Sequence, residues 1–122
     1  MKKPRIDEQA VVADGAVVLG DVTIEKDVSI WYNAVIRGDV NSISIGEGTN
    51  IQDLAVLHVD ADESLAIGKN VTIGHGAILH GCTIKDQALI GMGAIVLNGA
   101  VIGKGSMIAA GALVPQNTVV PD

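Results

Sequence analysis

Three histidines are the residues of this sequence whose type and spacing point most directly to chemistry. His58, His75 and His80 are the only histidines among 122 residues. Neutral imidazole is a common zinc ligand, and three such ligands leave a fourth coordination position open, as in catalytic sites. A metal ion in such a site lowers the pKa of bound water to about 7, which provides hydroxide at neutral pH. This chemistry requires a scaffold that brings the three side chains together.

A repeat of six residues is the element that would position them. A fixed internal period is typical of a solenoid, whereas a helix would show a period near 3.6 and a plain strand a period near 2. Glycine is frequent between the repeat positions and accepts positive φ, so we predict short strands joined by tight bends. With longer steps after Ile36 and Leu57 and a step of five before Ile84, all eighteen repeat positions are aliphatic: Val12, Val18, Ile24, Ile30, Ile36, Ile45, Ile51, Leu57, Ile67, Ile73, Leu79, Ile84, Ile90, Val96, Ile102, Ile108, Val114 and Val120.

This pattern resembles that of the hexapeptide-repeat proteins over roughly residues 11–121. The resemblance implies an all-β fold, a single-stranded left-handed parallel β-helix in which three hexads form one triangular coil. The left hand comes from the resemblance alone, because about 98% of parallel crossovers are right-handed. Eighteen hexads would form about six coils, a prism ~29 Å long. We expect residues 1–122 to form a single domain.

The repeat would place His58 and His80 on the same face of the prism. Each directly follows a repeat position, and those two positions are three steps, or one coil, apart. The extra residues between them, 58–65, would form a loop that does not change the face. We therefore expect the two backbones to lie ~4.8 Å apart, so that the imidazoles can share one metal ion. Arg37 falls in the same column, where its guanidinium suits a carboxylate.

His75 would lie on the adjacent face, together with Gln52 one coil earlier. Within one prism it is not expected to reach an ion held by the other two histidines. A neighbouring chain packed beside the prism could supply it, so that each site takes two histidines from one chain and one from the next. Closed cyclic symmetry would repeat the site at every interface, and the triangular shape favours a trimer with three sites.

Several short motifs also resemble those of the γ-class carbonic anhydrases and their close relatives. They are Arg37-Gly38-Asp39, Asn50-Ile51-Gln52-Asp53, His58, and Gly74-His75-Gly76-Ala77 continuing to His80-Gly81-Cys82. This combination is specific, whereas a hexapeptide repeat alone would be weak. The resemblance implies a carbonate dehydratase, a lyase that reversibly hydrates CO₂ to bicarbonate. It also implies a homotrimer with one Zn²⁺ or Fe²⁺ per subunit, bound between subunits.

The resemblance implies a role for each matching residue. His58 and His80 would bind the metal together with His75 of the partner subunit. For Asn50, a bend residue that tolerates the left-handed conformation is an equally good interpretation. Near the reacting water the resemblance implies two polar residues, Gln52 and Asn50. In the interface network it implies Arg37, Asp39 and Asp53.

The sequence departs from the γ-class pattern at three points. The best-studied members carry a proton-transferring Glu directly after Arg-Gly-Asp, and here that position is Val40. Their acidic loop is longer, so the remaining candidates for a proton relay are Asp60, Asp62 and Glu63, for which a solvated loop is the simpler interpretation. The C-terminal helix of the family has no counterpart before Asp122, which leaves the last coil without that cap. Because fast CO₂ hydration requires protons to be exported from the metal-bound water, these departures predict weak or lost activity.

Composition argues against several other functions. The net charge of −6 and the pI near 4.8 are unlike those of nucleic-acid-binding proteins. Residues 88–114 carry one charge but keep the repeat and its glycines, so we interpret them as β-helix and expect no membrane association. No signal-peptide pattern follows Met1. One cysteine, Cys82, fits a reducing compartment such as the cytoplasm, either as a repeat residue near a bend or as a reactive thiol.

Two other functions compete with CO₂ hydration. Many hexapeptide-repeat proteins transfer acyl groups from acyl-CoA and use a metal-free histidine as general base, and a metal-hydroxide thioesterase acting on acyl-CoA is a related hypothesis. The other competing function is that of a non-catalytic, metal-binding trimeric scaffold, which Val40 and the short acidic loop favour. Full metal occupancy without activity on CO₂ or thioesters would favour the scaffold.

Overall fold

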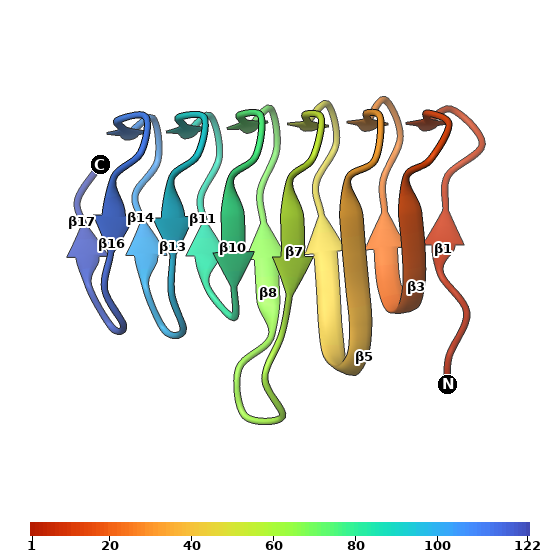
Figure 1. Cartoon of the computed structure of the whole chain (residues 1–122), viewed down its shortest axis with the longest axis horizontal. Coiled ribbons are helices and arrows are strands. Elements are labelled where there is room, and N and C mark those ends of the chain that lie inside the picture. Colours follow the sequence, from red (N-terminus) through yellow and green to blue (C-terminus); the bar gives the residue numbers. More distant parts are fainter.

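The repeat folds as predicted. The computed structural model of the chain describes residues 1–122, and all of its regular elements are strands. These strands wind as a parallel β-helix of about six coils, with the two termini at opposite ends of the long axis (Figure 1). The architecture agrees with the left-handed β-helix that the repeat and the resemblance imply.

The coils present three faces. The first face is a sheet of β2 (Val11–Val12), β4 (Ser29–Ile30), β6 (Asn50–Ile51), β9 (Thr72–Ile73), β12 (Leu89–Ile90) and β15 (Met107–Ile108). The other two faces share one sheet, because β3 (Val17–Ile24) and β5 (Val35–Ile45) bend across the corner between them. The second face continues with β7 (Val56–His58), β10 (Ile78–His80), β13 (Ile95–Val96) and β16 (Leu113–Val114). The third adds β1 (Arg5–Ile6), β8 (Leu65–Ile67), β11 (Thr83–Ile84), β14 (Val101–Ile102) and β17 (Val119–Val120).

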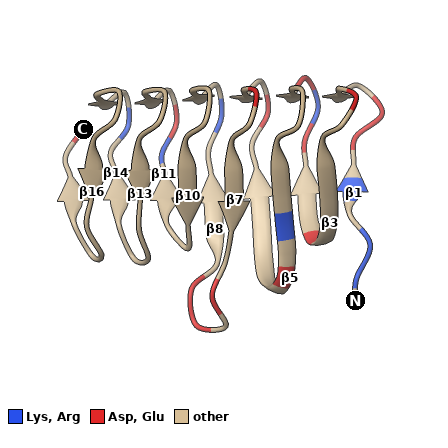
Figure 2. Cartoon of the chain, in the orientation of Figure 1, with Lys and Arg blue, Asp and Glu red and all other residues tan.

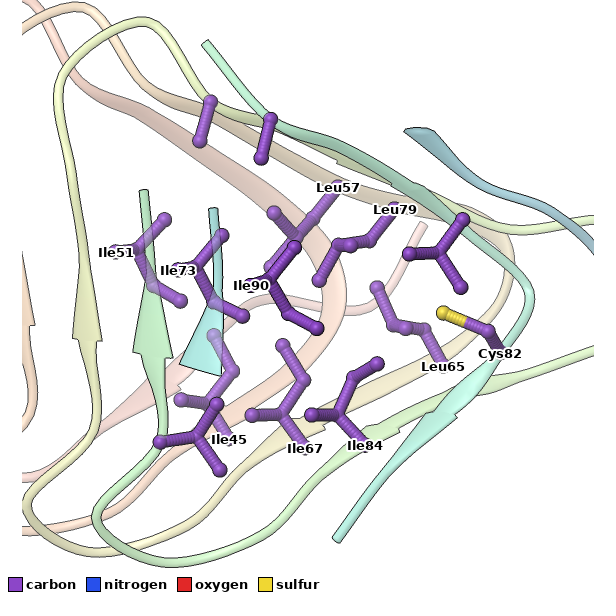
Figure 3. Close-up of a cluster of buried hydrophobic side chains, with 14 of the residues drawn as sticks. Ile45, Ile51, Leu57, Leu65, Ile67, Ile73, Leu79, Cys82, Ile84 and Ile90 are labelled. Atoms are coloured by element: carbon purple, nitrogen blue, oxygen red, sulfur yellow. The ribbon is translucent and has the colours of Figure 1, made fainter. Parts of the chain in front are cut away.

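The repeat positions form the core. Parallel pairing aligns them from coil to coil, as in Leu57 opposite Leu79 and Ile51 opposite Ile73. The buried hydrophobic residues form one continuous cluster, in which side chains of successive coils stack along the axis (Figure 3). Val12 is 39% exposed because its coil has a neighbour on one side only. Burial is therefore supplied by adjacent coils, as expected for a solenoid.

Cys82 belongs to this core. Its side chain is 1% exposed and points toward Leu65 (Figure 3). Burial raises the pKa of the thiol to about 12. A protonated, inaccessible thiol is a poor nucleophile, so the structure supports a packing role and not a reactive one.

The first strand lies outside the predicted repeat of about residues 11–121. β1 pairs with β3, with Ile6 opposite Ile24. Ile6 stands one six-residue step before Val12 and so occupies a further repeat position, which the surrounding charged residues obscure in the sequence. Because Ile6 is itself 44% exposed, polar contacts from Arg5 carry much of the attachment of this strand.

The ion pair between Arg5 and Asp21 should make the attachment of β1 depend on pH. Arg5 donates to Asp21 at 2.8 Å, and this bond, together with the charges of Lys2 and Arg5, holds the pKa of Asp21 below its usual value of 3.8. A carboxyl whose pKa is lower in the folded state stabilises that state above its unfolded pKa, and this contribution is lost as pH falls through the folded value. At about pH 6 we expect faster hydrogen exchange of the Asp7 amide, which bonds to Ile24, in Asp21→Asn than in the wild type.

That difference should shrink as the pH falls below the usual value of 3.8 and disappear below the lowered pKa of the folded state, where the wild-type carboxyl is protonated. The Gly93 amide, in the turn after β12, serves as an internal reference distant from β1. Equal Asp7 exchange in the two proteins at about pH 6 would show that the ion pair does not hold the strand.

One loop departs clearly from the regular coil. We expected residues 58–65 to bulge, and the structure narrows the loop to residues 59–64 because β7 ends at His58 and β8 begins at Leu65. The loop projects beyond the prism and carries a cluster of acidic residues (Figure 2). The faces before and after it stay in register, so the loop extends the chain without moving the histidines.

The segment of low charge, residues 88–114, forms β12 to β16 and the turns between them, as the repeat predicts. No helix of the structure has the length and apolar character needed to cross a membrane.

Candidate metal centre

Two of the histidines lie side by side on the second face. β7 and β10 pair in parallel with His58 opposite His80. His58 Nδ1 and His80 Nε2 are 3.1 Å apart. Two nitrogens bound to one tetrahedral zinc ion, each ~2.0–2.1 Å from it, would lie about 3.3 Å from each other. The pair therefore fits two adjacent positions of one coordination sphere.

The outer nitrogens of both imidazoles have oxygen partners. His58 Nε2 lies 2.9 Å from Asp39 Oδ1, and His80 Nδ1 lies 2.6 Å from Asn98 Oδ1. Carboxylate and amide oxygens only accept hydrogen bonds, so each outer nitrogen carries the hydrogen. In neutral imidazoles the two inner nitrogens then face each other as lone pairs, which repel unless a cation lies between them. Metal-binding histidines show this pattern, with the second nitrogen donating to an oxygen.

Asp39 joins His58 to Arg37. One carboxylate oxygen of Asp39 faces His58, and the other accepts a hydrogen bond from Arg37 Nη1. The hydrogen bond to His58 and the one from Arg37 hold the pKa of Asp39 below its usual value. Asp39 is thus an ionised group that orients His58. The sequence predicts an interface network for this pair, and the structure shows the two residues paired within one chain.

His75 lies in the turn between β9 and β10, at the corner between the first and second faces. We expected it on the first face, and the turn at residues 74–77 holds it at the edge of that face. Its side chain is 57% exposed, and its nearest acidic partner is Asp53, at 3.6 Å. His75 and His80 belong to different segments, the turn at residues 74–77 and β10, and His75 makes no hydrogen bond with either of the other two histidines. Accordingly, no group of three or more metal-binding residues comes together within one chain.

Asn50 and Gln52 lie on the first face, around β6. Gln52 Nε2 donates to Asn50 Oδ1 at 3.0 Å, and Asn50 Nδ2 donates to Thr72 Oγ1 at 3.3 Å. Both side chains are therefore oriented by polar neighbours. Both residues lie on the first face, as does β9, the strand that leads to His75. The other two histidines lie on the second face. Their expected place near the metal-bound water stays a prediction that depends on a second chain.

Of the acidic loop residues, Asp60 contacts the site. Asn98, which spacing alone does not assign to the site, donates from Nδ2 to Asp60 Oδ2 at 2.7 Å and accepts from His80. The signal was present in the sequence, because Asn98 follows His80 by about one coil and is an amide in a nearly uncharged segment. Asp62 is exposed and Glu63 partly buried.

A row of aliphatic side chains runs along the second face on the same outward side as the histidine pair. Val56 and His58 project together because side chains alternate along a strand, and so do Ile78 and His80. Val56 is 36% and Ile78 is 39% exposed. A continuous outward apolar row is typical of a protein interface. Parallel pairing aligns its members from coil to coil: Val17, Val35, Val56, Ile78, Ile95 and Leu113.

The fold and the paired histidines define the class of protein. The bacterial transferase hexapeptide family (six repeats) matches residues 81–116. The crystal structure of the BC4754 gene product of Bacillus cereus, named as an acetyltransferase, superimposes with a TM-score of 0.97 at 48% identity, over 98% of this chain and 70% of that chain. The chain is a hexapeptide-repeat β-helix protein.

Two further relatives narrow the family. Gamma carbonic anhydrase 1, mitochondrial, of Arabidopsis thaliana is 54% identical over 98% of this chain and 46% of its own length. The carbonic anhydrase of Geobacillus kaustophilus is 47% identical over 80% of this chain and 53% of its own. The chain belongs to the γ-class carbonic anhydrase-like family. It spans about half the length of these curated relatives.

Proposed function

We propose that this chain forms a homotrimer that reversibly hydrates CO₂ to bicarbonate at metal sites between its subunits. The pair of inner nitrogens on His58 and His80, 3.1 Å apart with both outer nitrogens bonded to oxygens, carries this proposal. The geometry suits Zn²⁺ or Fe²⁺, because imidazole binds both metals. The reaction is proposed because relatives named carbonic anhydrase are 54% and 47% identical to this chain.

The third ligand would come from another subunit. His75 is exposed at the corner of the second face, too far along its own chain to join the pair. The aliphatic row on the second face supplies apolar surface that a neighbouring prism could bury. A cyclic trimer would bring the exposed corner of one prism to the histidine pair of the next at each of three interfaces.

In this arrangement each polar residue has a defined task. The bound metal would supply the Lewis acid that makes a water molecule nucleophilic at neutral pH. Asp39 and Asn98 contact the outer nitrogens of His58 and His80, and the inner nitrogens would bind the metal. Gln52, itself oriented by Asn50, would hydrogen-bond the reacting water and direct its attack onto the carbon of CO₂.

Proton export would fall to the acidic loop. Val40 stands where the resemblance implies a proton-transferring Glu. It is 58% exposed and has no titratable group that could transfer a proton. Asp60 is bonded to Asn98, which leaves Asp62 and Glu63 as the groups free to accept protons from water. We therefore expect turnover to depend on buffer concentration, because external buffer can replace a weak internal relay.

An acyltransferase is the second candidate. The name of the Bacillus cereus structure as an acetyltransferase favours it, as does the exposed His75 with Asp53 3.6 Å away, a pair that could work as a general base. Such a base would have to be free of metal. The partners of His58 and His80 favour metal binding, so we place this function second.

Two measurements on the same sample test the proposal. The metal content of the purified oligomer, by elemental analysis after anaerobic loading with Zn²⁺ or Fe²⁺, should approach one ion per chain. Stopped-flow CO₂ hydration should then exceed that of chelator-treated protein. Metal-free oligomer that binds acetyl-CoA would favour the acyltransferase, and full metal content without hydration would favour a non-catalytic scaffold.

For the location of the protein we propose a reducing compartment such as the cytoplasm, since its one thiol is buried and unpaired. The Arabidopsis relative is named as mitochondrial.

A further inference from the structure

The amide of Asn98 stands between a metal-binding histidine and the acidic loop. Asn98 lies in the turn after β13. Its Oδ1 is 2.6 Å from His80 Nδ1, and its Nδ2 is 2.7 Å from Asp60 Oδ2. The space for this side chain is kept by Gly81, because a Cβ there would lie 2.6 Å from Asn98 Oδ1.

Only one orientation of this amide satisfies both neighbours. Asp60 is a carboxylate that accepts hydrogen bonds, so it requires the NH₂ group of Asn98. The carbonyl oxygen of Asn98 is then turned to His80 Nδ1, which must donate. Rotating the amide by half a turn would place its oxygen against the carboxylate of Asp60. The carboxylate thus determines which nitrogen of His80 carries the hydrogen.

The loop holds Asp60 in place for this contact. Asp60 and Glu63 close a tight turn with backbone hydrogen bonds of 3.1 and 3.3 Å. Asn41 Nδ2, from β5, donates to the backbone oxygens of Asp60 at 3.1 Å and of Ala61 at 3.0 Å. The backbone that carries the Asp60 carboxylate is therefore held by two separate elements, the turn and β5 of the preceding coil.

We propose that Asn98, oriented by Asp60, is a positioning residue that selects the Nδ1–H tautomer of His80 and so presents its Nε2 to the metal. This inference rests on the proposed metal site. It gives the short acidic loop a task distinct from proton transfer. Because linkage is reciprocal, metal binding and the order of the loop should support each other.

The tautomer can be read directly without metal. In ¹⁵N-histidine-labelled, metal-free protein at about pH 8, where imidazole is neutral, NMR should show His80 as the Nδ1–H form. Asn98→Ala and Asp60→Asn should each shift it toward a mixture with Nε2–H. His75, which contacts neither residue, is the internal reference and should not change.

A double variant tests the hydrogen-bond logic and guards against loss of folding. In Asn98→Asp combined with Asp60→Asn, the carboxylate at position 98 accepts from His80 and from the amide at position 60. This exchange should restore the Nδ1–H form. Co²⁺ affinity, measured by chelator competition, should fall roughly 10–100-fold in Asn98→Ala and recover in the double variant. Hydrogen exchange of the Glu63 amide should follow the same order.

The outcomes separate this inference from the proposed function. An unchanged His80 tautomer and Co²⁺ affinity in Asn98→Ala, with a metal-binding wild type, would overturn the positioning role and leave the metal site standing. A wild type that binds no Co²⁺ would overturn the metal site, while the NMR result would still decide whether Asn98 sets the tautomer. Failure of the double variant to recover while Asn98→Ala stays folded would also contradict the inference.

Discussion

An equal mixture of His75→Ala and His80→Ala chains, refolded together, should recover about a quarter of the wild-type metal sites, although each variant alone binds almost none. In the proposed cyclic trimer each site would take the histidine pair from one chain and His75 from its neighbour. Half of the chains keep the pair and half of the neighbours keep His75, so about one interface in four is complete. Metal content and CO₂ hydration should recover in the same proportion.

Each single variant should lose metal affinity by roughly 10³-fold or more, since changes one shell further out already cost 10–100-fold. CO₂ hydration should fall to the level of chelator-treated protein. A mixture of His58→Ala with His80→Ala is the matched control, because both alter the same pair and no interface regains it. Recovery in this control, or full metal content in His75→Ala, would contradict a site shared between subunits.

Gly20→Ala should destabilise the β-helix by roughly 4 kcal/mol or more, while Gly93→Ala should cost about 1–2 kcal/mol. Both glycines have left-handed φ, 87° and 71°, so both variants carry a similar backbone strain. They differ in space, because a Cβ on Gly20 would lie 2.2 Å from the Gly38 carbonyl oxygen, whereas nothing lies within 4 Å of one on Gly93. The difference therefore measures how closely β3 and β5 pack.

Chemical denaturation of the two variants and the wild type is the measurement for this pair. Gly20→Ala should also weaken metal binding, because the added methyl group would press on the segment that carries Asp39, whose amide nitrogen lies 3.1 Å from the Cβ position. Gly93→Ala should bind metal like the wild type. Equal destabilisation by the two variants would show that the coils can separate at Gly20 at little cost.

The periodic part of the fold was predictable because each repeat position meets the same environment. An aliphatic residue every six positions predicts which side chains face the axis, and Ile51, Leu57 and Ile73 are indeed fully buried. The predicted repeat, about residues 11–121, did not include Ile6, because charged residues surround this single repeat position. That strand is attached partly through Arg5 and Asp21, and such contacts leave no period in the sequence.

The candidate site was predictable only as far as counting along the coil allows. Counting places His58 opposite His80, and the structure confirms this register. Counting also places His75 on the adjacent face, away from the pair, and the turn at residues 74–77 holds it at the edge of that face. The partners Asp39 and Asn98 depend on how side chains turn at the corners, where the backbone leaves the regular strand and spacing no longer gives direction.

The sequence by itself determined the period, the core and the column that the paired histidines share, because parallel stacking converts a count of residues into a position. Tertiary structure alone decided which atoms meet. The loop at residues 59–64 folds back so that Asp60 reaches Asn98, and the bend of β5 turns Asp39 onto His58. Hydrogen bonds need positions correct to within a few tenths of an ångström. Such accuracy comes from the packing of several coils against one another and not from the spacing within any one of them.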